Sequence, residues 1–460
     1  MSVSLLPITI IPVKRFQENL FRIQMSHSLI HYWNIDLHIP HVLHIGRRSI
    51  QITIEGANMT KDQFLFSDRL FQECLLPIEE LNFVAAYSNT DHSLTLGPVI
   101  GLLTDLNDTG EEPDFRSIHA FCYELHEVVS NLGGYFYVFH FKDFEAGKLQ
   151  GYCHQDGMWL KKEVPLPGVI YNRIHSRLLE ASTAFQSFRK SISSLTIPMF
   201  NDRFLSKKEV HQLLHSEYHM EPYLPDTVIA DEQTVKELLA KHESIYIKPI
   251  HGSQGRSIIR TTLNGDEIIA QLSSGSRKEE TLFFENYTRF THWFKHQLMK
   301  KTFLAQQAIP LQTYKNRQFD FRILCHKNFQ DTWKATSAVA RVSAEQQFVS
   351  NIARGGEMMK PIKIFSLLSD QKTAIQQLAL LKELAVETAS IISQKSDGLI
   401  GELGIDIGID NKGKLWIIEA NSKPSKNFED SCKKIRPSAK ALIEYAVSLS
   451  FSGRPLKEDY

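Results

Sequence analysis

Two apolar runs close to the C-terminal end, 404–410 and 414–420, flank the tripeptide Asn411-Lys412-Gly413. A short segment with Asn and Gly between two alternating runs is a strong turn signal, so the runs are predicted to pair as a β-hairpin. This feature constrains the fold most, because pairing fixes which side chains of the two strands face each other.

Acidic and amide side chains interrupt both strands of the predicted hairpin. Successive side chains of a strand alternate between its faces, so Glu419 and Asn421 share one face. If residues 411–414 form the loop, Asp406 lies directly across from Glu419. Neighbouring carboxylates repel each other unless a positive charge lies between them. The hairpin trio (Asp406, Glu419 and Asn421) offers hard oxygen ligands suited to one or two Mg²⁺ ions, and a solvent-facing edge with incidental charges is the alternative.

A glycine-containing loop follows the predicted strand 244–249. The strand carries Lys248 at its end, and the loop contains Gly252, Ser253 and Gly255. Glycines let backbone N–H groups approach a phosphate closely, and the lysine adds a positive charge on the same polyanion. The loop matches neither the Walker nor the dinucleotide pattern, because it lacks a Gly-Lys-Ser/Thr end and a strand follows it. Taken alone, it could be an ordinary hairpin turn.

Composition excludes several classes of protein. The 460 residues are 42% hydrophobic and 23% charged, the profile of a globular protein of about two to four domains. Lys plus Arg and Asp plus Glu both number 52, so no overall charge attracts nucleic acid or an anionic membrane. No apolar run approaches the roughly 20 residues of a membrane span, and no signal peptide is evident, which predicts a cytoplasmic protein. Reduced thiols are expected for Cys74, Cys122, Cys153, Cys325 and Cys432, which lack zinc or disulfide spacing.

The rhythm of the predicted elements divides the chain into three parts. Residues 1–90 contain short extended runs between polar or proline-containing turns, which indicates a β-rich module. Residues 91–200 alternate strand and helix, as a parallel α/β domain does. Residues 201–450 contain further strands, a helix over 372–394 and both candidate features. The predicted fold class is α/β (α+β).

The features occur in the order of the ATP-grasp superfamily: a lysine-ended strand, a glycine-rich loop, an Asp-x-Arg strand and an Asp…Glu-x-Asn hairpin. Further motifs resemble the YheC/YheD family, which is associated with the endospore coat, and the length is more similar to YheD. The resemblance covers roughly residues 95–450 and implies an ATP-grasp domain over 201–450 after a pre-ATP-grasp domain over 91–200. The motifs that carry it are Gly151-Tyr152, Trp159, 165–174, Phe200-Asn201, Lys207, 224–227 and 419–424.

The resemblance implies which residues bind the nucleotide. Lys207 and Lys248 would be the two lysines of the ATP site, next to the glycine loop. The backbone of a hinge would hydrogen-bond adenine, and its residues are Gln306, Gln307 and Ile309. Lys207 could instead be a solvated charge on a helix.

It also implies which residues surround the transferred phosphate. Arg322 of the Asp-x-Arg strand, Arg341 and Asn351 would contact that phosphate, and the hairpin trio would bind Mg²⁺. Arg322 and Arg341 could instead form ordinary salt bridges, and Asn351 could cap a helix. Arg173 ends a strand of the preceding domain, where substrates of such ligases often lie.

The implied reaction is carbon–nitrogen ligation. A carboxylate attacks the γ-phosphate of ATP to give an acyl phosphate, and an amine then displaces phosphate. Such chemistry needs charge neutralisation and alignment more than acid–base groups, and no Ser-His-Asp or Cys-His set is apparent in the sequence. An ATP-binding coat-assembly protein without turnover and a phosphotransferase on the same fold are the alternatives. The expected partners are ATP, an unidentified small or peptide-like carboxylate and amine, and spore-coat proteins, with the spore coat or forespore surface as a second location.

Overall fold

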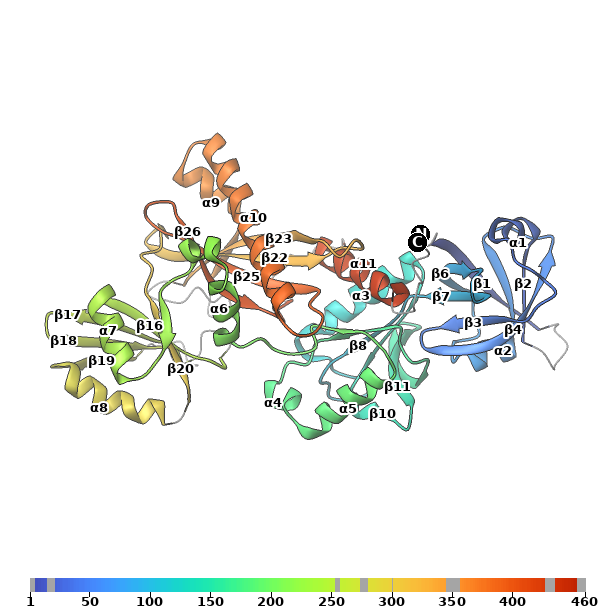
Figure 1. The fold of residues 1–460 in the computed structure, drawn as a ribbon, viewed down its shortest axis with the longest axis horizontal. Coiled ribbons are helices and arrows are strands. Elements are labelled where there is room, and N and C mark those ends of the chain that lie inside the picture. Colours follow the sequence, from blue (N-terminus) through green and yellow to red (C-terminus); the bar gives the residue numbers. More distant parts are fainter. Residues whose placement is uncertain are drawn as a thin grey trace.

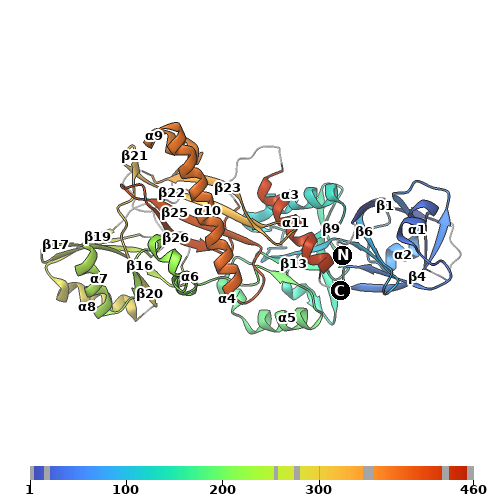
Figure 2. The ribbon, with the colours of Figure 1, turned by 45° about the horizontal axis from the view of Figure 1, so that its top comes forward.

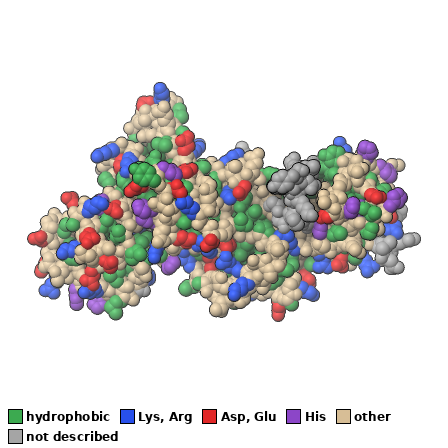
Figure 3. Space-filling view, viewed as in Figure 1, with side chains coloured by type: hydrophobic (Ala, Val, Ile, Leu, Met, Phe, Trp, Pro, Cys, Tyr) green, Lys and Arg blue, Asp and Glu red, His purple; other side chains and the backbone are tan. Residues whose placement is uncertain are grey.

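The computed structural model describes residues 5–14, 21–252, 257–273, 280–299, 301–344, 356–426 and 435–452. These residues form an elongated molecule with a β-barrel at one end, an α/β domain in the middle and two further sheets toward the other end (Figure 1). Acidic and basic side chains are interspersed over the face shown in Figure 3, in keeping with the balanced composition.

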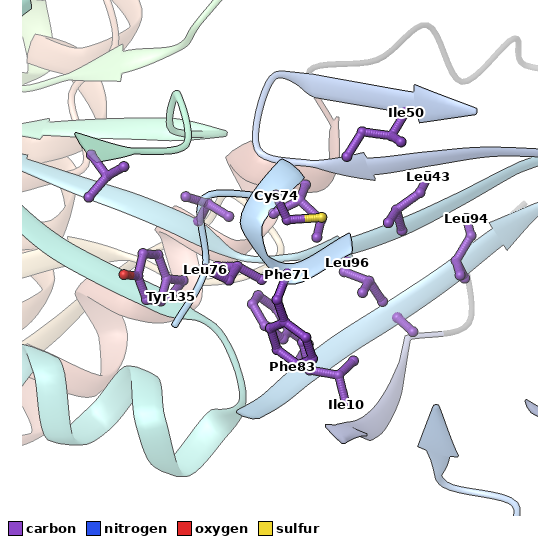
Figure 4. Packing of buried hydrophobic residues seen from close by; sticks show 14 of the residues in the cluster. Ile10, Leu43, Ile50, Phe71, Cys74, Leu76, Phe83, Leu94, Leu96 and Tyr135 are labelled. Carbon is purple, nitrogen blue, oxygen red and sulfur yellow. The ribbon is translucent and has the colours of Figure 1, made fainter. Parts of the chain in front are cut away.

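Seven strands between residues 6 and 97 close into a barrel with the order β1-β5-β2-β4-β3-β7-β6. Alternate side chains of these strands point inward, so aliphatic and aromatic residues such as Ile10, Leu43 and Phe83 fill the interior (Figure 4). The elements are β1 Leu6–Val13, β2 Arg22–Ser26, α1 His27–Trp33, β3 His41–Ile45, β4 Arg48–Ala57, β5 Gln63–Ser67, α2 Asp68–Glu73, β6 Leu81–Ser88 and β7 Ser93–Gly97.

The middle domain is a sheet with the order β10-β11-β9-β8-β13-β14, in which β9, β8, β13 and β14 run parallel. The parallel strands are apolar on both faces because helices cover both sides, as in other parallel sheets. The elements are β8 Val99–Leu103, η1 Arg116–Ile118, α3 His119–Leu132, β9 Tyr135–Phe139, η2 Phe141–Asp143, β10 Phe144–Glu145, β11 Lys148–Gln155, β12 Met158–Val164, β13 Val169–Asn172, α4 Arg177–Glu180, α5 Thr183–Ser194 and β14 Met199–Phe200.

The remaining strands form two antiparallel sheets. The first has the order β15-β20-β16-β17-β18-β19, and the second β24-β23-β22-β25-β26. Their elements are α6 Lys207–His215, η3 Tyr218–Tyr223, β15 Thr227–Ile229, α7 Glu232–His242, β16 Ser244–Pro249, β17 Ile259–Asn264, β18 Glu267–Leu272, β19 Glu280–Phe284, α8 Tyr287–Leu298, β20 Phe303–Gln307, β21 Thr313–Tyr314, β22 Arg317–Lys327, β23 Trp333–Val342, β24 Glu357–Met359, α9 Pro361–Leu368, α10 Gln371–Lys395, β25 Glu402–Ile409 and β26 Leu415–Asn421.

The last helix, α11 (Pro437–Ser452), returns to the middle domain and lies beside α3 (Figures 1 and 2). Leu442, Ile443 and Tyr445 of this helix are buried in the same apolar cluster as Phe121 of α3 and Phe200 of β14. The chain segment after residue 201 therefore contributes to three hydrophobic core clusters, one of which it shares with the middle domain.

The long helix expected over 372–394 is α10, which begins after the N-cap Asp370 and lies across the second sheet (Figure 2). Among the described residues, no helix is long and apolar enough to cross a membrane. Four cysteines (Cys74, Cys122, Cys153 and Cys325) are buried free thiols, and Cys432 lies outside the described residues.

Candidate functional site

The predicted hairpin is formed by β25 and β26, and its register pairs Asp406 with Glu419 as the sequence predicts. Gly404 pairs with Asn421, two residues further along β26. The turn is fixed by Asp410, whose carboxylate accepts hydrogen bonds from the Lys412 amide at 2.9 Å and from the Trp416 indole at 2.9 Å. The turn therefore sets the register as far as the Ile407–Ile417 pair, and a shift of register between Ile407 and Asp406 then brings Asp406 opposite Glu419.

Asp406 is buried and is neutralised by two arginines from neighbouring strands. Arg322 of β22 donates from Nη2 to Oδ2 at 2.7 Å and also contacts the carboxylate through Nε, and Arg341 of β23 lies 3.0 Å away through Nη2. Arg341 is also held by Asp320, at 2.6 and 2.7 Å. Burial opposes ionisation of Asp406, but the charges of Arg322 and Arg341 hold its pKa below the ordinary value. Both arginines thus form salt bridges here, and these salt bridges lie at the predicted site.

Glu419 is the more accessible carboxylate, with a side chain that is 30% exposed. Lys207 at the first turn of α6 donates to Glu419 Oε1 at 2.6 Å and lies 3.4 Å from the Gly252 carbonyl. One lysine therefore joins α6, the start of the glycine loop and the hairpin. Lys207 faces the hairpin and is not a solvated helix charge.

Lys248 lies at the end of β16, close to this group. Burial lowers the pKa of its ammonium to about 8, with the Glu419 carboxylate opposing that change and the Lys207 charge adding to it. Its Nζ donates to Gln306 Oε1 at 2.6 Å, and Gln306 Nε2 donates to Thr227 Oγ1 at 3.1 Å. The side chain of Gln306 thus holds the lysine in position.

The other two hinge residues lie at the end of β20 and beyond it. The Gln307 amide donates to the Asp226 carbonyl at 2.8 Å, and Ile309 accepts from the Leu311 amide at 2.8 Å. Of the other predicted site residues, Ser253, Gly255 and Asn351 lie outside the described residues.

A pocket separates the first sheet from β26 and α6. Its polar lining consists of Lys207, Lys248 and Glu419 at one end, together with Gln306 and Thr227. The rest of its wall is mostly apolar, together with His211: Val210, Leu214, Leu224, Pro225, Leu304, Ile417, Ile418 and Ala420. Helix α6, β16 and β26, which contribute to it, lie close together in Figures 1 and 2. An apolar slot with two cations at one end suits a flat ring system attached to a polyanion.

Among the described residues, no group of three His, Cys, Asp or Glu side chains converges as a metal site. The hairpin trio contributes two carboxylates and one amide oxygen, a donor set that suits Mg²⁺. Because arginines engage both oxygens of Asp406, Glu419 and Asn421 are the more available ligands.

A buried charge cluster behind the site was not predicted from the sequence. The Glu402 cluster consists of Glu402 on β25 and four groups that contact its carboxylate: Tyr171 Oη at 2.6 Å, His326 Nε2 at 3.0 Å, Arg173 Nη1 at 3.4 Å and Lys426 Nζ. Glu402 is fully buried, and Arg173, 2% exposed, also donates to the Pro424 carbonyl at 3.0 Å. Arg173 therefore connects the middle domain to the hairpin and does not face an open substrate site. The feature of the sequence that could have indicated this cluster is the carboxylate of Glu402 within an otherwise apolar strand.

The family model and the related proteins found by comparison point to the same family. A family model described as YheC/D-like ATP-grasp matches residues 196–449, more than half of the chain. The endospore coat-associated protein YheD of Bacillus subtilis (strain 168) is 28% identical over 387 residues, covering 83% of this chain and 84% of that protein. The endospore coat-associated protein YheC of the same strain is 25% identical over 283 residues, covering 61% and 76%.

Solved structures with lower identity were also found. The ATP-grasp ligase PsnB in complex with a minimal precursor has a TM-score of 0.42 and 14% identity, covering 76% of this chain and 99% of that chain. The D-alanine-D-alanine ligase from Coxiella burnetii has a TM-score of 0.43 and 12% identity, covering 77% and 95%.

Proposed function

Because the chain belongs to the YheC/D-like ATP-grasp family, we propose that it binds ATP with Mg²⁺ and joins a carboxylate to an amine through an acyl phosphate. The observation that supports this most is the convergence of Lys207, Lys248 and Glu419 at the polar end of an otherwise mostly apolar pocket. Two lysines beside a single accessible carboxylate form a site with unused positive charge, which a triphosphate would satisfy.

In this proposal, each region of the pocket binds a different part of the nucleotide. The apolar wall formed by Leu304, Ile417 and their neighbours would take the adenine ring, next to the hinge. Lys207 and Lys248 would then face the phosphates. In this arrangement Lys207 exchanges its contact with Glu419 for a phosphate oxygen and frees that carboxylate for the metal.

Glu419 and Asn421 would hold Mg²⁺, with Asp406 behind them. When bound, the metal neutralises phosphate oxygens and aligns the γ-phosphate for attack. Asp406 and Asp320 hold the guanidinium groups of Arg322 and Arg341 through paired hydrogen bonds, so little reorganisation is needed when negative charge develops nearby. The chain's own contribution is therefore fixed positive charge and alignment.

The test is ADP and phosphate release by Glu419→Gln in a mixture of pooled carboxylates and amines with Mg²⁺ and ATP. We expect the wild type to turn over only when both pools are present, and the variant to lose that activity. Glu357→Gln is a matched control, because Glu357 is an exposed carboxylate of the same sheet that pairs with Arg317. Its turnover should equal that of the wild type.

The alternatives give different results in the same assay. Turnover with one pool alone indicates a phosphotransferase, and ATP binding by calorimetry without turnover indicates an ATP-binding assembly protein. Unchanged turnover in Glu419→Gln would contradict the metal role. The names of the two relatives motivate a role at the endospore coat, which a fluorescent fusion followed through sporulation tests.

A further inference from the structure

The carboxyl-terminal ends of the parallel strands β8 and β13 lie at the same edge of the middle sheet. Asp105 follows β8 by two residues, and His175 follows β13 by three. Ser117 lies in η1, which leads into α3. Ligands of open α/β sheets bind outside this edge, so side chains that meet here are in a position to act on a substrate.

The three side chains form a continuous hydrogen-bonded row. His175 Nδ1 lies 3.1 Å from Asp105 Oδ1, and the His175 backbone amide donates to the same oxygen at 2.7 Å. His175 Nε2 lies 3.1 Å from Ser117 Oγ. The imidazole therefore uses one nitrogen toward the carboxylate and the other toward the hydroxyl.

The charge of Asp105 determines where the protons are. Burial opposes its ionisation, but the hydrogen bonds from the ring and the amide of His175 lower its pKa to about 2. An ionised carboxylate only accepts hydrogen bonds, so the neutral imidazole carries its proton on Nδ1. Nε2 is then an acceptor, and the Ser117 hydroxyl donates its proton toward it.

Access increases along the row. The Asp105 side chain is 12% exposed, that of His175 is 29% exposed, and Ser117 is exposed. Arg116, immediately before Ser117, has a left-handed φ of 54°, which is unfavourable for a long side chain and turns the chain sharply at this point. Its guanidinium lies 3.4 Å from Asp105 Oδ2 and is about half exposed. A positive charge thus lies beside the carboxylate, at the Asp105 end of the row.

We propose that Ser117 and His175, positioned by Asp105, form a second reactive centre that cleaves esters or thioesters of small acyl groups without ATP. Ser117 Oγ attacks the carbonyl carbon while His175 Nε2 takes the hydroxyl proton. The bond to the alcohol or thiol breaks, and that leaving group takes the proton from the imidazolium. Water then attacks the acyl-Ser117 ester with His175 again as base, which releases the acid and restores the serine. Activated acyl groups are the expected substrates, because Ser117 is exposed and water stabilises the oxyanion less than a buried pair of donors would.

The test uses the full chain and a fluorophosphonate probe, which reacts with base-activated serines. We expect intact-mass analysis to show one added group, mapped to Ser117, and p-nitrophenyl acetate hydrolysis in the absence of ATP. Ser117→Ala and His175→Gln should abolish both signals. Asp105→Asn should slow labelling about 10²-fold or more, because the neutral amide can donate to Nδ1, so it neither fixes the tautomer nor stabilises the imidazolium.

A matched control comes from the barrel, where Ser49 Oγ lies 2.8 Å from His44 Nδ1. Ser49→Ala should leave labelling and hydrolysis unchanged. Each variant is first checked for a wild-type unfolding transition, so that loss of signal is not loss of fold. Labelling of the wild type at the rate of Ser117→Ala, or labelling that persists in His175→Gln, would overturn the proposal whatever the outcome of the ATP assays.

Discussion

Replacement of Tyr171 by Phe removes a single hydroxyl from the Glu402 cluster and keeps the ring in place. The hydroxyl donates to Glu402 Oε2 at 2.6 Å, and both residues are fully buried. Burial raises the pKa of Tyr171 to about 12, so the hydroxyl stays protonated and donates at any ordinary assay pH. The ring of Tyr171 stacks on Phe200 at 4.8 Å, a contact that Phe retains.

The expected loss is that of one hydrogen bond to a charged group. Such bonds contribute about 1.5–3 kcal/mol, against about 0.5–1.5 kcal/mol for bonds between neutral groups. Glu402 keeps His326, Arg173 and Lys426 as partners, so the carboxylate is not left unpaired and the larger cost of an orphaned charge does not apply. A loss of about 1.5–3 kcal/mol in the free energy of unfolding corresponds to a roughly 10- to 150-fold increase in the unfolded population.

The measurement is urea denaturation, monitored through amide hydrogen exchange of the middle domain. Tyr135→Phe is the matched control. Tyr135 is a buried tyrosine of the same sheet whose hydroxyl lies 3.2 Å from the weak acceptor Cys153 Sγ. Its loss should cost about 0.5 kcal/mol or less, at the lower end of the range for neutral groups. Equal costs for the two variants would refute the reasoning, because the charge of Glu402 would then add nothing to the bond.

Two further predictions concern Lys248, which is proposed to bind the nucleotide, and the α11 interface. Since burial lowers the pKa of Lys248 to about 8, its ammonium is present below that pH and lost above it, so calorimetric ATP affinity should fall by about tenfold per pH unit above pH 8. Lys248→Arg should remove this dependence, and an equally steep fall in that variant would assign the titration to another group. Gly401→Ala should destabilise the protein by about 1–3 kcal/mol in thermal unfolding, because its Cβ would lie 2.4 Å from the Tyr445 ring and 2.9 Å from Phe200. Gly110→Ala, whose Cβ has its nearest neighbour at 3.4 Å, is the control, and equal losses would mean that the ring contacts relax freely.

The hairpin could be predicted from the sequence because its information is local. The turn residues and the period of two predict the two strands and their pairing, whereas the Asp406–Glu419 pair also depends on a shift of register between Asp406 and Ile407. Strand β16 with its terminal Lys248 has the bounds expected from the sequence, for the same reason. The fold class followed from the order of such local elements and from family motifs.

The partners of these carboxylates could not be predicted in the same way. Sequence reasoning expected a metal to neutralise Asp406, whereas the structure shows Arg322 and Arg341 doing so from strands more than sixty residues earlier in the sequence. The contact between Ser117 and His175 could not be predicted from their spacing either, because the contact depends on which strands end at the same edge of the sheet. Long-range contacts of this kind are set by the topology of the fold, and the hydrophobic periodicity of the sequence does not predict that topology.

Strand β25 carries both the Glu402 cluster and Asp406, and this determines how the domains can move. The two carboxylates are four residues apart and share one face of the strand, about 13 Å along it. Glu402 is bound by Tyr171 and Arg173 of the middle domain, so separating that domain from the hairpin would break the buried Arg173–Glu402 pair and the Tyr171 hydrogen bond. Breaking one buried pair costs about 3–5 kcal/mol. We therefore expect the carboxyl edge of the middle sheet and the Asp406 end of the hairpin to move as one unit. Closure around the proposed nucleotide would then come from the sheet β15-β20-β16-β17-β18-β19, which carries Lys248 and the start of the glycine loop.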